Sequence, residues 1–377
     1  MQYRKFGDLD FEVSALGFGA MRLPTDEENN ILEDEAIRMI RYALDQGVNY
    51  VDTAWPYHDK QSEPLVGKAL QDGYRKKTKI ATKLPSWALE ERSDMDEYLD
   101  KQREKLGVEK IDFYLLHALT EDRWNKYKEF DVFSWIDKVK KEGKIEHIGF
   151  SFHDDYNVFV KIIDDYEDWD FCQIQYNYLD VEFQAGRRGM KYAARNDVPV
   201  IVMEPLRGGQ LAQDPPEEVK DIISKADIDR SMADLALQWI WNQPEVATVL
   251  SGMSTMQQVK ENVESASRSG VNHLSEKELQ LVEKIAQKMR GPIQCTQCNY
   301  CMPCPTGVNI PGNFKLYNRA HVYQEFAKNK EKYFEQDKKV RAAACVRCGQ
   351  CEPACPQNLN IMDLLEKVDQ YFSRSTG

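Results

Sequence analysis

The sequence alternates short apolar runs with amphipathic segments over most of its length, and this alternation strongly limits the possible folds. Helical periodicity follows the apolar runs, for example in residues 34–47, where Ile37, Ile40 and Leu44 share one face. Strands that are separated by helices in this way favour a parallel sheet. The expected strands are residues 15–19, 49–54, 79–84, 111–118, 147–152, 171–177, 198–206 and 248–254.

Eight strands that are each followed by a helix predict a closed (β/α)8 TIM barrel, in the α/β class. Residues 1–13 precede the first barrel strand and are expected to form a hairpin across the bottom of the barrel. The last helix of this body begins with Ser275 and Glu278 at capping-box spacing. An open doubly wound sheet is the alternative, but residues 17–22 (GFGAMR) lack the third glycine of a Rossmann fingerprint.

Eight of the nine cysteines lie in two short runs near the end of the chain. Residues 345–356 read C-x2-C-x2-C-x3-C-P, the run of bacterial ferredoxins, and residues 295–305 read C-x2-C-x2-C-x2-C-P. Two such runs predict two [4Fe–4S] clusters. Zinc sites and disulfides are the alternatives, but zinc normally uses separated C-x2-C pairs, and disulfides are rare in a reducing compartment. The ninth cysteine, Cys172, is expected to lie in the core.

The two runs resemble those of two-cluster ferredoxins, in which the fourth cysteine of each run binds the other cluster. The long helical segment between them, residues 314–343, is more similar to the helical two-cluster modules of larger redox enzymes. By this resemblance one cluster is bound by Cys295, Cys298, Cys301 and Cys355, and the second by Cys345, Cys348, Cys351 and Cys304.

The net charge of the cysteine-rich part of the chain differs in sign from that of the part before it. Residues 291–377 contain 11 Lys and Arg against 8 Asp and Glu, a net charge of +3, although the whole chain carries −12. The tail cations can offset the negative charge of bound clusters, and the acidic body argues against nucleic acid. We therefore expect a barrel over residues 1–290 and a small α-helical, ferredoxin-like two-cluster domain over residues 291–377. A signal peptide and membrane spans are not expected, so we expect a cytoplasmic protein.

Four titratable residues mark the carboxyl ends of successive predicted strands. Asp52, Lys83 and His117 each follow a mostly apolar run, and Tyr57 lies in the loop after Asp52. Each alone has an ordinary structural explanation, but in a barrel these strand ends converge where active sites are built. A buried Asp52 and Lys83 must pair, and an ammonium near Tyr57 favours the phenolate. A general acid beside a histidine that orients a substrate oxygen suits carbonyl reduction.

With these motifs in place, residues 1 to about 290 resemble the aldo/keto reductase family. The matching motifs are VDTAxxY (Asp52, Tyr57), ATK (Lys83), LLH (His117), GFS (Ser151), PLxGG (205–209) and GMSxxxQVxEN (252–262). The resemblance implies that Tyr57 donates the proton, that Lys83 and Asp52 tune it, and that His117 orients the carbonyl. It also implies that NADP or NAD binds across the barrel mouth without a Rossmann motif.

The same resemblance suggests which residues contact the nucleotide. Ser151 and Gln173 match carboxamide-binding positions, and Ser254 matches a phosphate-binding position that is also a plausible helix N-cap, with Gln257 completing a capping box. The expected contacts are Ser151, Gln173, Met203, Pro205, Leu206, Arg207, Gly208, Gly209, Ser254, Gln258, Glu261 and Asn262.

Three positions depart from the family pattern: Phe152 follows Ser151, Met203 replaces a stacking aromatic residue, and Gln258 replaces an arginine that favours NADP. They leave the choice between NAD and NADP open.

The combination predicts an NAD(P)H-dependent oxidoreductase that reduces a small aldehyde or ketone to an alcohol, with an iron–sulfur domain attached. The alternative is an electron-transfer enzyme, in which the clusters exchange electrons with a ferredoxin-like partner and with a nicotinamide or flavin at the barrel mouth. A barrel that has lost catalysis and only carries the clusters is disfavoured by the intact set of four residues. Trp55, His58 and Trp87 are expected to border the substrate pocket.

Overall fold

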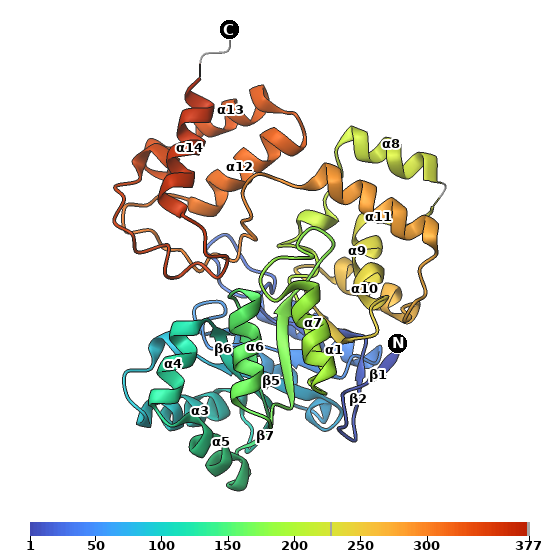
Figure 1. Cartoon of the computed structure of the whole chain (residues 1–377), viewed down its shortest axis with the longest axis vertical. Helices are drawn as coiled ribbons and strands as arrows, with labels where there is room; N and C mark the ends of the chain where they lie inside the picture. Colours follow the sequence, from blue (N-terminus) through green and yellow to red (C-terminus); the bar gives the residue numbers. More distant parts are fainter. Residues whose placement is uncertain (227, 375–377) are drawn as a thin grey trace. The chain divides into compact units, whose positions relative to one another are not determined.

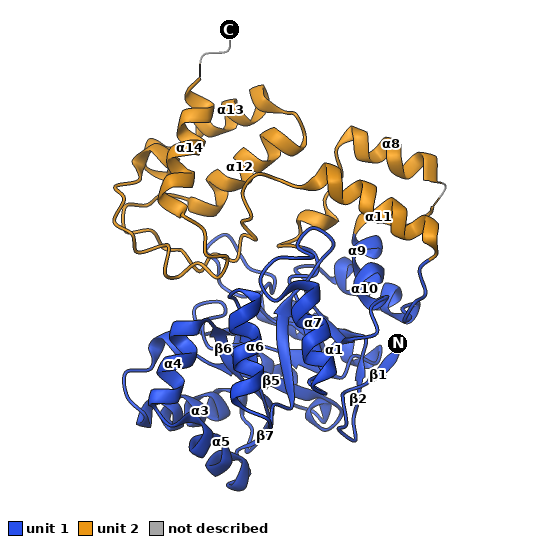
Figure 2. Ribbon diagram, viewed as in Figure 1, with its two compact units in different colours: residues 1–206, 233–274 blue, residues 207–232, 275–377 orange. Residues whose placement is uncertain are grey.

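A computed structural model of the chain describes residues 1–226 and 228–374 (Figure 1). By contacts the chain divides into two compact units (Figure 2). The first unit contains residues 1–206 and 233–274, and the second contains residues 207–232 and the chain from residue 275 onwards. The sequence predicts a domain boundary at residue 290, whereas the contacts group residues 207–232 with the cysteine-rich part of the chain. The boundary at residue 290 stays a prediction.

The first unit is built around a closed barrel of eight parallel strands, in the order β10-β3-β4-β5-β6-β7-β8-β9. This confirms the predicted (β/α)8 barrel and every one of its expected strands. Strand β9 ends at Met203, three residues earlier than expected, because left-handed backbone begins at Glu204 (φ 55°). The strands are β3 (Leu16–Gly19), β4 (Tyr50–Asp52), β5 (Lys79–Leu84), β6 (Ile111–Leu119), β7 (Ile145–Phe152), β8 (Phe171–Gln175), β9 (Val200–Met203) and β10 (Val246–Gly252).

Helices between the strands form the outer layer of the barrel, since parallel strands need crossover connections. On the first helix Ile40 and Leu44 are buried and Ile37 is half-buried, which agrees with the predicted face. These helices are α1 (Glu33–Asp45), α2 (Ser62–Ala69), α3 (Ser93–Leu106), α4 (Glu121–Glu129), α5 (Val132–Lys141), α6 (Tyr156–Asp165), α7 (Gly186–Arg195), α9 (Met232–Trp241) and α10 (Met256–Ser267).

The chain begins with an antiparallel hairpin of β1 (Tyr3–Lys5) and β2 (Glu12–Ser14). Between its strands, the fully buried Phe6 packs on Phe113 and Phe171, with ring centroids 5.1 Å and 5.9 Å apart. Both partners lie near the amino ends of β6 and β8, so the hairpin closes the bottom of the barrel as expected. The opposite end of the barrel, where the strands have their carboxyl ends, is the end at which active sites of such barrels are built.

The second unit is helical. Helices α12, α13 and α14 enclose a small core around Phe314, Tyr333 and Phe372, against which several cysteines pack. The predicted capping box at Ser275 and Glu278 is present at the start of α11. The helices are α8 (Glu217–Ala226), α11 (Glu276–Met289), α12 (Ile310–Val322), α13 (Phe326–Glu335) and α14 (Ile361–Ser373).

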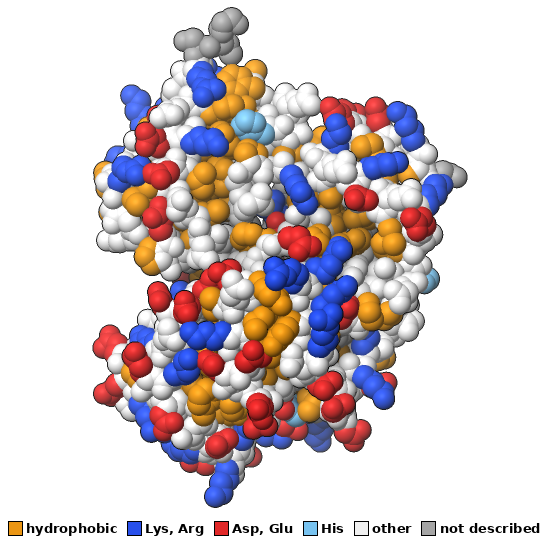
Figure 3. Space-filling model, in the orientation of Figure 1, with side chains coloured by type: hydrophobic (Ala, Val, Ile, Leu, Met, Phe, Trp, Pro, Cys, Tyr) orange, Lys and Arg blue, Asp and Glu red, His pale blue; other side chains and the backbone are white. Residues whose placement is uncertain are grey.

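Charged side chains of both signs are interspersed over the face of the molecule shown in Figure 3. Among the described residues, none of the helices has the length and apolar composition needed to cross a membrane.

Candidate active site

The centre of the candidate site is a buried ion pair between neighbouring strands. Asp52 is the last residue of β4, and Lys83 lies near the end of β5. The Lys83 Nζ donates to Asp52 Oδ1 at 2.7 Å and to the carbonyl oxygen of Thr53 at 2.8 Å. Burial raises the pKa of Asp52 and lowers the pKa of Lys83, and the attraction between the two charges opposes both shifts. The pair thus holds an ammonium group in a fully buried position.

Tyr57 completes the coordination of this ammonium. The loop after β4 brings its hydroxyl oxygen to 3.3 Å from Lys83 Nζ, which donates to it. A cation that donates to a phenol oxygen stabilises the phenolate over the phenol. The Tyr57 side chain is only 8% exposed, so this interaction lies largely out of water.

His117, near the end of β6, also lies beside Tyr57. The two ring centroids are 6.3 Å apart, with the planes at 80°. Burial, and after it the positive charge of Lys83, hold the pKa of His117 well below its usual range. The imidazole is therefore neutral at physiological pH and can donate one hydrogen bond from a ring nitrogen. The structure brings together all four residues that the sequence singled out, in separate loops and strands.

A buried polar network behind Lys83 was not foreseen from the sequence. Gln102 of α3 donates to the carbonyl oxygen of Lys83 at 3.0 Å and accepts from Tyr114 at 2.6 Å. Thr82 donates to Glu63 of α2 at 2.7 Å. All these side chains are fully buried, so β5 is fixed from its outer side by two helices.

Of the three residues expected to border the pocket, Trp87 is in contact with the site. Its ring centroid lies 5.0 Å from that of His117. Trp55 packs edge-to-face on Tyr98 at 4.9 Å, and His58 accepts a backbone N–H. Trp87 is 42% exposed, which suits a side chain at the edge of a pocket.

Arg123 and His153 also lie near His117, and the sequence did not point to either. Arg123 of α4 donates to the carbonyl oxygen of Ala118 at 2.7 Å and lies over the Trp87 ring. Burial and the charge of Arg123 lower the pKa of His153 from 6.5 to about 4. His153 follows β7 directly, so its place at a strand end is the signal that could have found it.

Three of the expected nucleotide contacts lie side by side on strands β7, β8 and β9. Ser151 of β7 is paired with Gln173 of β8, and Met203 of β9 is paired with Gln175 of β8. The Ser151 hydroxyl accepts the N–H of Ala118 at 2.7 Å, and Gln173 donates to the Met203 sulfur at 3.4 Å. Across residues 1–226 and 228–374, the buried Gln173 Oε1 finds no hydrogen-bond partner. An uncompensated amide oxygen at this position is suited to a donor from a bound molecule.

Four further expected contacts lie on or just before α10, where one prediction was wrong. The N-cap of α10 is Thr255, whose hydroxyl accepts from Gln258 N, and not Ser254. Gln258 instead reaches back to accept the N–H of Ser254 at 2.8 Å, because the helix begins one residue later than expected. The Asn262 side chain is buried and donates to Ser251 at 3.0 Å, and Glu261 is exposed.

The PLxGG segment follows β9. Pro205 and Leu206 belong to the first unit, and Arg207, Gly208 and Gly209 to the second. Left-handed backbone runs through Arg207 (φ 48°), Gly208 (φ 63°) and Gly209 (φ 86°), a conformation that glycine adopts readily.

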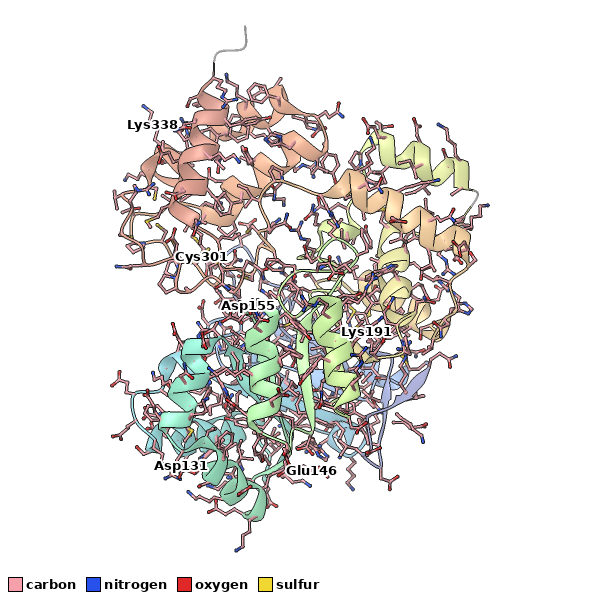
Figure 4. The ribbon with its side chains drawn as sticks, viewed as in Figure 1. Asp131, Glu146, Asp155, Lys191, Cys301 and Lys338 are labelled. Atoms are coloured by element: carbon pink, nitrogen blue, oxygen red, sulfur yellow. The ribbon has the colours of Figure 1, made fainter. Side chains whose placement is uncertain are left out.

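The cysteines of the second unit form two groups. Cys304 lines a cavity of about 120 Å³ together with Cys345, Cys348 and Cys351, so the first run does reach across to the second. Cys301 lines this cavity too, and Figure 4 labels it among the cysteine loops.

The other four cysteines form the second group. Burial, followed by the negative charge of the Cys298, Cys295 and Cys355 thiolates, raises the pKa of Cys301, which places Cys355 near the first run. The contacts place Cys304 near the second run and Cys355 near the first, and the two complete ligand sets stay a prediction. Cys172 is fully buried in β8, and its pKa is raised by burial.

The donor chemistry of these groups fits iron–sulfur clusters. Among the described residues, no three Cys, His, Asp or Glu side chains converge closely enough to hold one metal ion. A [4Fe–4S] cubane needs no such convergence, because each of its four irons takes a single thiolate and the cysteines surround a space.

Comparison with known proteins identifies two regions of similarity. Residues 15–287 match the model of the aldo/keto reductase family, and residues 294–360 match that of a 4Fe-4S dicluster domain. An uncharacterized oxidoreductase of Schizosaccharomyces pombe is 30% identical over 266 residues, which cover 68% of this chain and 83% of the relative. An L-galactose dehydrogenase of Arabidopsis thaliana is 28% identical over 314 residues, covering 77% and 96% of the two chains. A solved aldo-keto reductase of Bacillus halodurans, AKR11C1, superposes with a TM-score of 0.62 at 29% identity, over 76% of this chain and 96% of that one.

Proposed function

The chain belongs to the aldo/keto reductase family of NAD(P)-dependent oxidoreductases and carries a C-terminal 4Fe–4S dicluster domain, and from this we propose that it reduces a small aldehyde or ketone to an alcohol. The observation that carries the proposal is the contact of the buried Lys83 ammonium with the Tyr57 hydroxyl, at 3.3 Å. A tyrosine activated in this way is a general acid for a substrate oxygen.

In the proposed mechanism Tyr57 transfers its proton to the carbonyl oxygen. A nicotinamide nucleotide, when bound, would supply the hydride for the carbonyl carbon. Lys83 stabilises the phenolate that forms on Tyr57, and Asp52 keeps Lys83 charged and in place through the 2.7 Å contact. The neutral His117 donates a hydrogen bond to the same carbonyl oxygen and so fixes its direction. Tyr57 then recovers a proton from solvent, and another turnover would follow release of the alcohol and exchange of the oxidised nucleotide for a reduced one.

The nucleotide, NADP or NAD, is proposed to bind at the strand ends that carry Ser151, Gln173 and Met203. The amide of a nicotinamide can donate to the buried Gln173 Oε1, which finds no partner among the described residues. Met203 supplies an apolar side chain for the ring. The phosphates and the adenine end are assigned to the remaining expected contacts, namely Pro205, Leu206, Arg207, Gly208, Gly209, Ser254, Gln258, Glu261 and Asn262.

The test replaces Tyr57 by Phe, which removes only the hydroxyl. Turnover of a panel of aldehydes and ketones, followed by loss of NAD(P)H absorbance, should fall by about 100-fold or more. Nucleotide binding, followed by fluorescence, should persist. Tyr42→Phe on the outer helix α1 is the matched control and should keep the wild-type rate. Full activity in Tyr57→Phe would exclude it as the acid, and a wild-type chain that binds no nucleotide would exclude the whole proposal.

A second candidate function, exchange of single electrons with a ferredoxin-like protein, is favoured by the exposure of Cys348, a proposed ligand of the second cluster. An exposed ligand allows a partner to approach the cluster closely. Chemically reduced ferredoxin, added to anaerobic protein, should bleach the cluster absorbance on mixing. An unchanged spectrum would rule out this exchange.

A further inference from the structure

The loop that follows β9 has its side-chain partners in the cysteine-rich part of the chain. Arg207 is 1% exposed. Its guanidinium donates to Gln210 Oε1 at 3.0 Å and to Gln294 Oε1. Gln294 directly precedes Cys295, the first cysteine of the first run. A buried arginine in the PLxGG loop is thus held by the neighbour of a proposed cluster ligand, within a single compact unit.

Gln294 is itself oriented by the backbone before it. Its Nε2 donates to the carbonyl oxygen of Gly291 at 3.0 Å, so its Oε1 is turned towards Arg207. Gln210, the other acceptor of Arg207, donates to the carbonyl oxygen of Met289 at 3.5 Å. Both amides connect the loop to the short linker between α11 and the first cysteine run.

The segment after the loop is held along the same unit by further polar contacts. Arg319 of α12 donates to Gln213 at 3.0 Å, and the Tyr323 hydroxyl donates to the carbonyl oxygen of Asp214 at 3.0 Å. Glu218 of α8 accepts from Gln324 at 3.0 Å. Residues 207–218 thus form a row of hydrogen bonds with residues 294–324, which begins at Arg207 and ends at Glu218. The contact of Arg207 with Gln294 is the one nearest in sequence to Gly208 and Gly209.

Backbone strain makes the contact of Arg207 with Gln294 important. Arg207 has φ 48°, a left-handed value that is unfavourable for a non-glycine residue. Such a residue keeps this conformation only where its surroundings hold it. The buried guanidinium donates to Gln210 and Gln294, and these contacts help to hold Arg207, which directly precedes Gly208 and Gly209.

We propose that Gln294 is a positioning residue for the nucleotide, and that the cluster bound by Cys295 keeps Gln294 in place. Through Arg207 it fixes the loop 207–209 in the shape that receives the nucleotide phosphates. The inference rests on the proposed function, because it assumes that this loop binds a nicotinamide nucleotide.

The cluster is a suitable anchor because residues 294–298 form no regular secondary structure. Gln297 in this stretch has φ 58°, a further left-handed residue. Metal–thiolate bonds order segments of this kind, and their loss releases them. The first cluster thereby acts on nucleotide affinity without accepting or giving an electron.

The principal test compares Gln294→Leu with the wild-type chain, using NADPH and NADH as probes. Leu keeps the size but cannot accept from Arg207. We expect the Kd from fluorescence titration and the KM for the nucleotide to rise about tenfold or more, with kcat nearly unchanged. Gln294→Glu restores an acceptor and should recover most of the affinity. Gln324→Leu, at the Glu218 end of the row of hydrogen bonds, is the matched control and should bind the nucleotide as the wild type does.

Iron content and the melting temperature are measured on each variant, so that loss of the cluster or of the fold is seen separately. Cys298→Ser, which removes a proposed ligand of the first cluster, should also weaken nucleotide binding. Wild-type Kd and KM in a Gln294→Leu variant that keeps its iron would overturn the inference alone. Absence of nucleotide binding in the wild type would instead overturn the proposed function, and this inference with it.

Discussion

The buried titratable residues around the candidate site differ in how they avoid an isolated charge. Lys83 keeps its charge because Asp52 lies 2.7 Å away. His117 and His153 need no carboxylate partner, because they are neutral. Burial lowers the pKa of each histidine, together with the charge of Lys83 at His117 and that of Arg123 at His153. A neutral histidine can donate to a substrate oxygen without competing with Tyr57 as the acid. At the residue scale the site therefore combines a cation that is paired with a carboxylate and histidines that are neutral.

The buried histidines predict that acid destabilises the fold. In the unfolded chain His153 takes up a proton near pH 6.5, whereas in the folded chain it does so only near pH 4. The unfolded state thus binds more protons between these values, and the free energy of unfolding falls as the pH decreases through this range. We expect His153→Asn to reduce this loss by about 1 kcal/mol per pH unit below pH 6.5. Urea unfolding, followed by circular dichroism between neutral pH and about pH 5.5, checks this.

The same slope in the variant and the wild type would contradict the lowered pKa. Unfolding at about pH 8, where the histidine is unprotonated in both states, measures the separate effect of the substitution on packing.

At the scale of elements, the sequence predicted the strands well and the details of their surroundings less well. Periodicity located each barrel strand because alternation and apolar runs are local signals. The one-residue shift from Ser254 to Thr255 at the start of α10 could not be predicted, since both residues are good caps. Gln102 was missed for a different reason: it lies on the buried face of α3, and only the tertiary fold shows that it binds the backbone of Lys83.

The corrected cap of α10 gives a prediction for this element. Thr255→Ala removes the acceptor for the N–H of Gln258 and should lower the free energy of unfolding by about 1 kcal/mol. Ser254→Ala should cost less, because the exposed Ser254 hydroxyl only donates to the carbonyl oxygen of Arg22. Chemical denaturation of both variants measures the difference. A larger effect at Ser254 than at Thr255 would show that the helix begins one residue earlier.

At the scale of the whole molecule, the motifs predicted two kinds of chemistry in one chain, and the family matches agree with that. The candidate tetrad and the two groups of cysteines could be predicted because their spacing in the sequence is distinctive. The grouping of residues 207–232 with residues from 275 onwards could not be predicted from the sequence. Partners such as Gln213 and Arg319 lie 106 positions apart. No local pattern marks a contact between two such distant polar side chains.

The cysteine groups predict the metal content of the chain. Two cubanes require about eight iron and about eight acid-labile sulfide atoms per chain in anaerobically purified protein. Cys304→Ala removes the ligand that the first run contributes to the cavity shared with Cys345, Cys348 and Cys351. This variant should retain about four irons, those of the other cluster. Metal analysis that finds zinc in place of iron, or a variant that keeps all its iron, would contradict the assignment.

A chain that matches two separate families suggests two modules that evolution, or an engineer, could exchange freely. The hydrogen bonds of residues 207–218 argue otherwise. A barrel cut from this chain at residue 290 would keep Arg207, Gln213 and Glu218 but lose Gln294, Arg319 and Gln324, their partners. A replacement tail would have to supply a matching set of polar side chains at these positions. Exchange of the tail is therefore expected to require matching substitutions in residues 207–218.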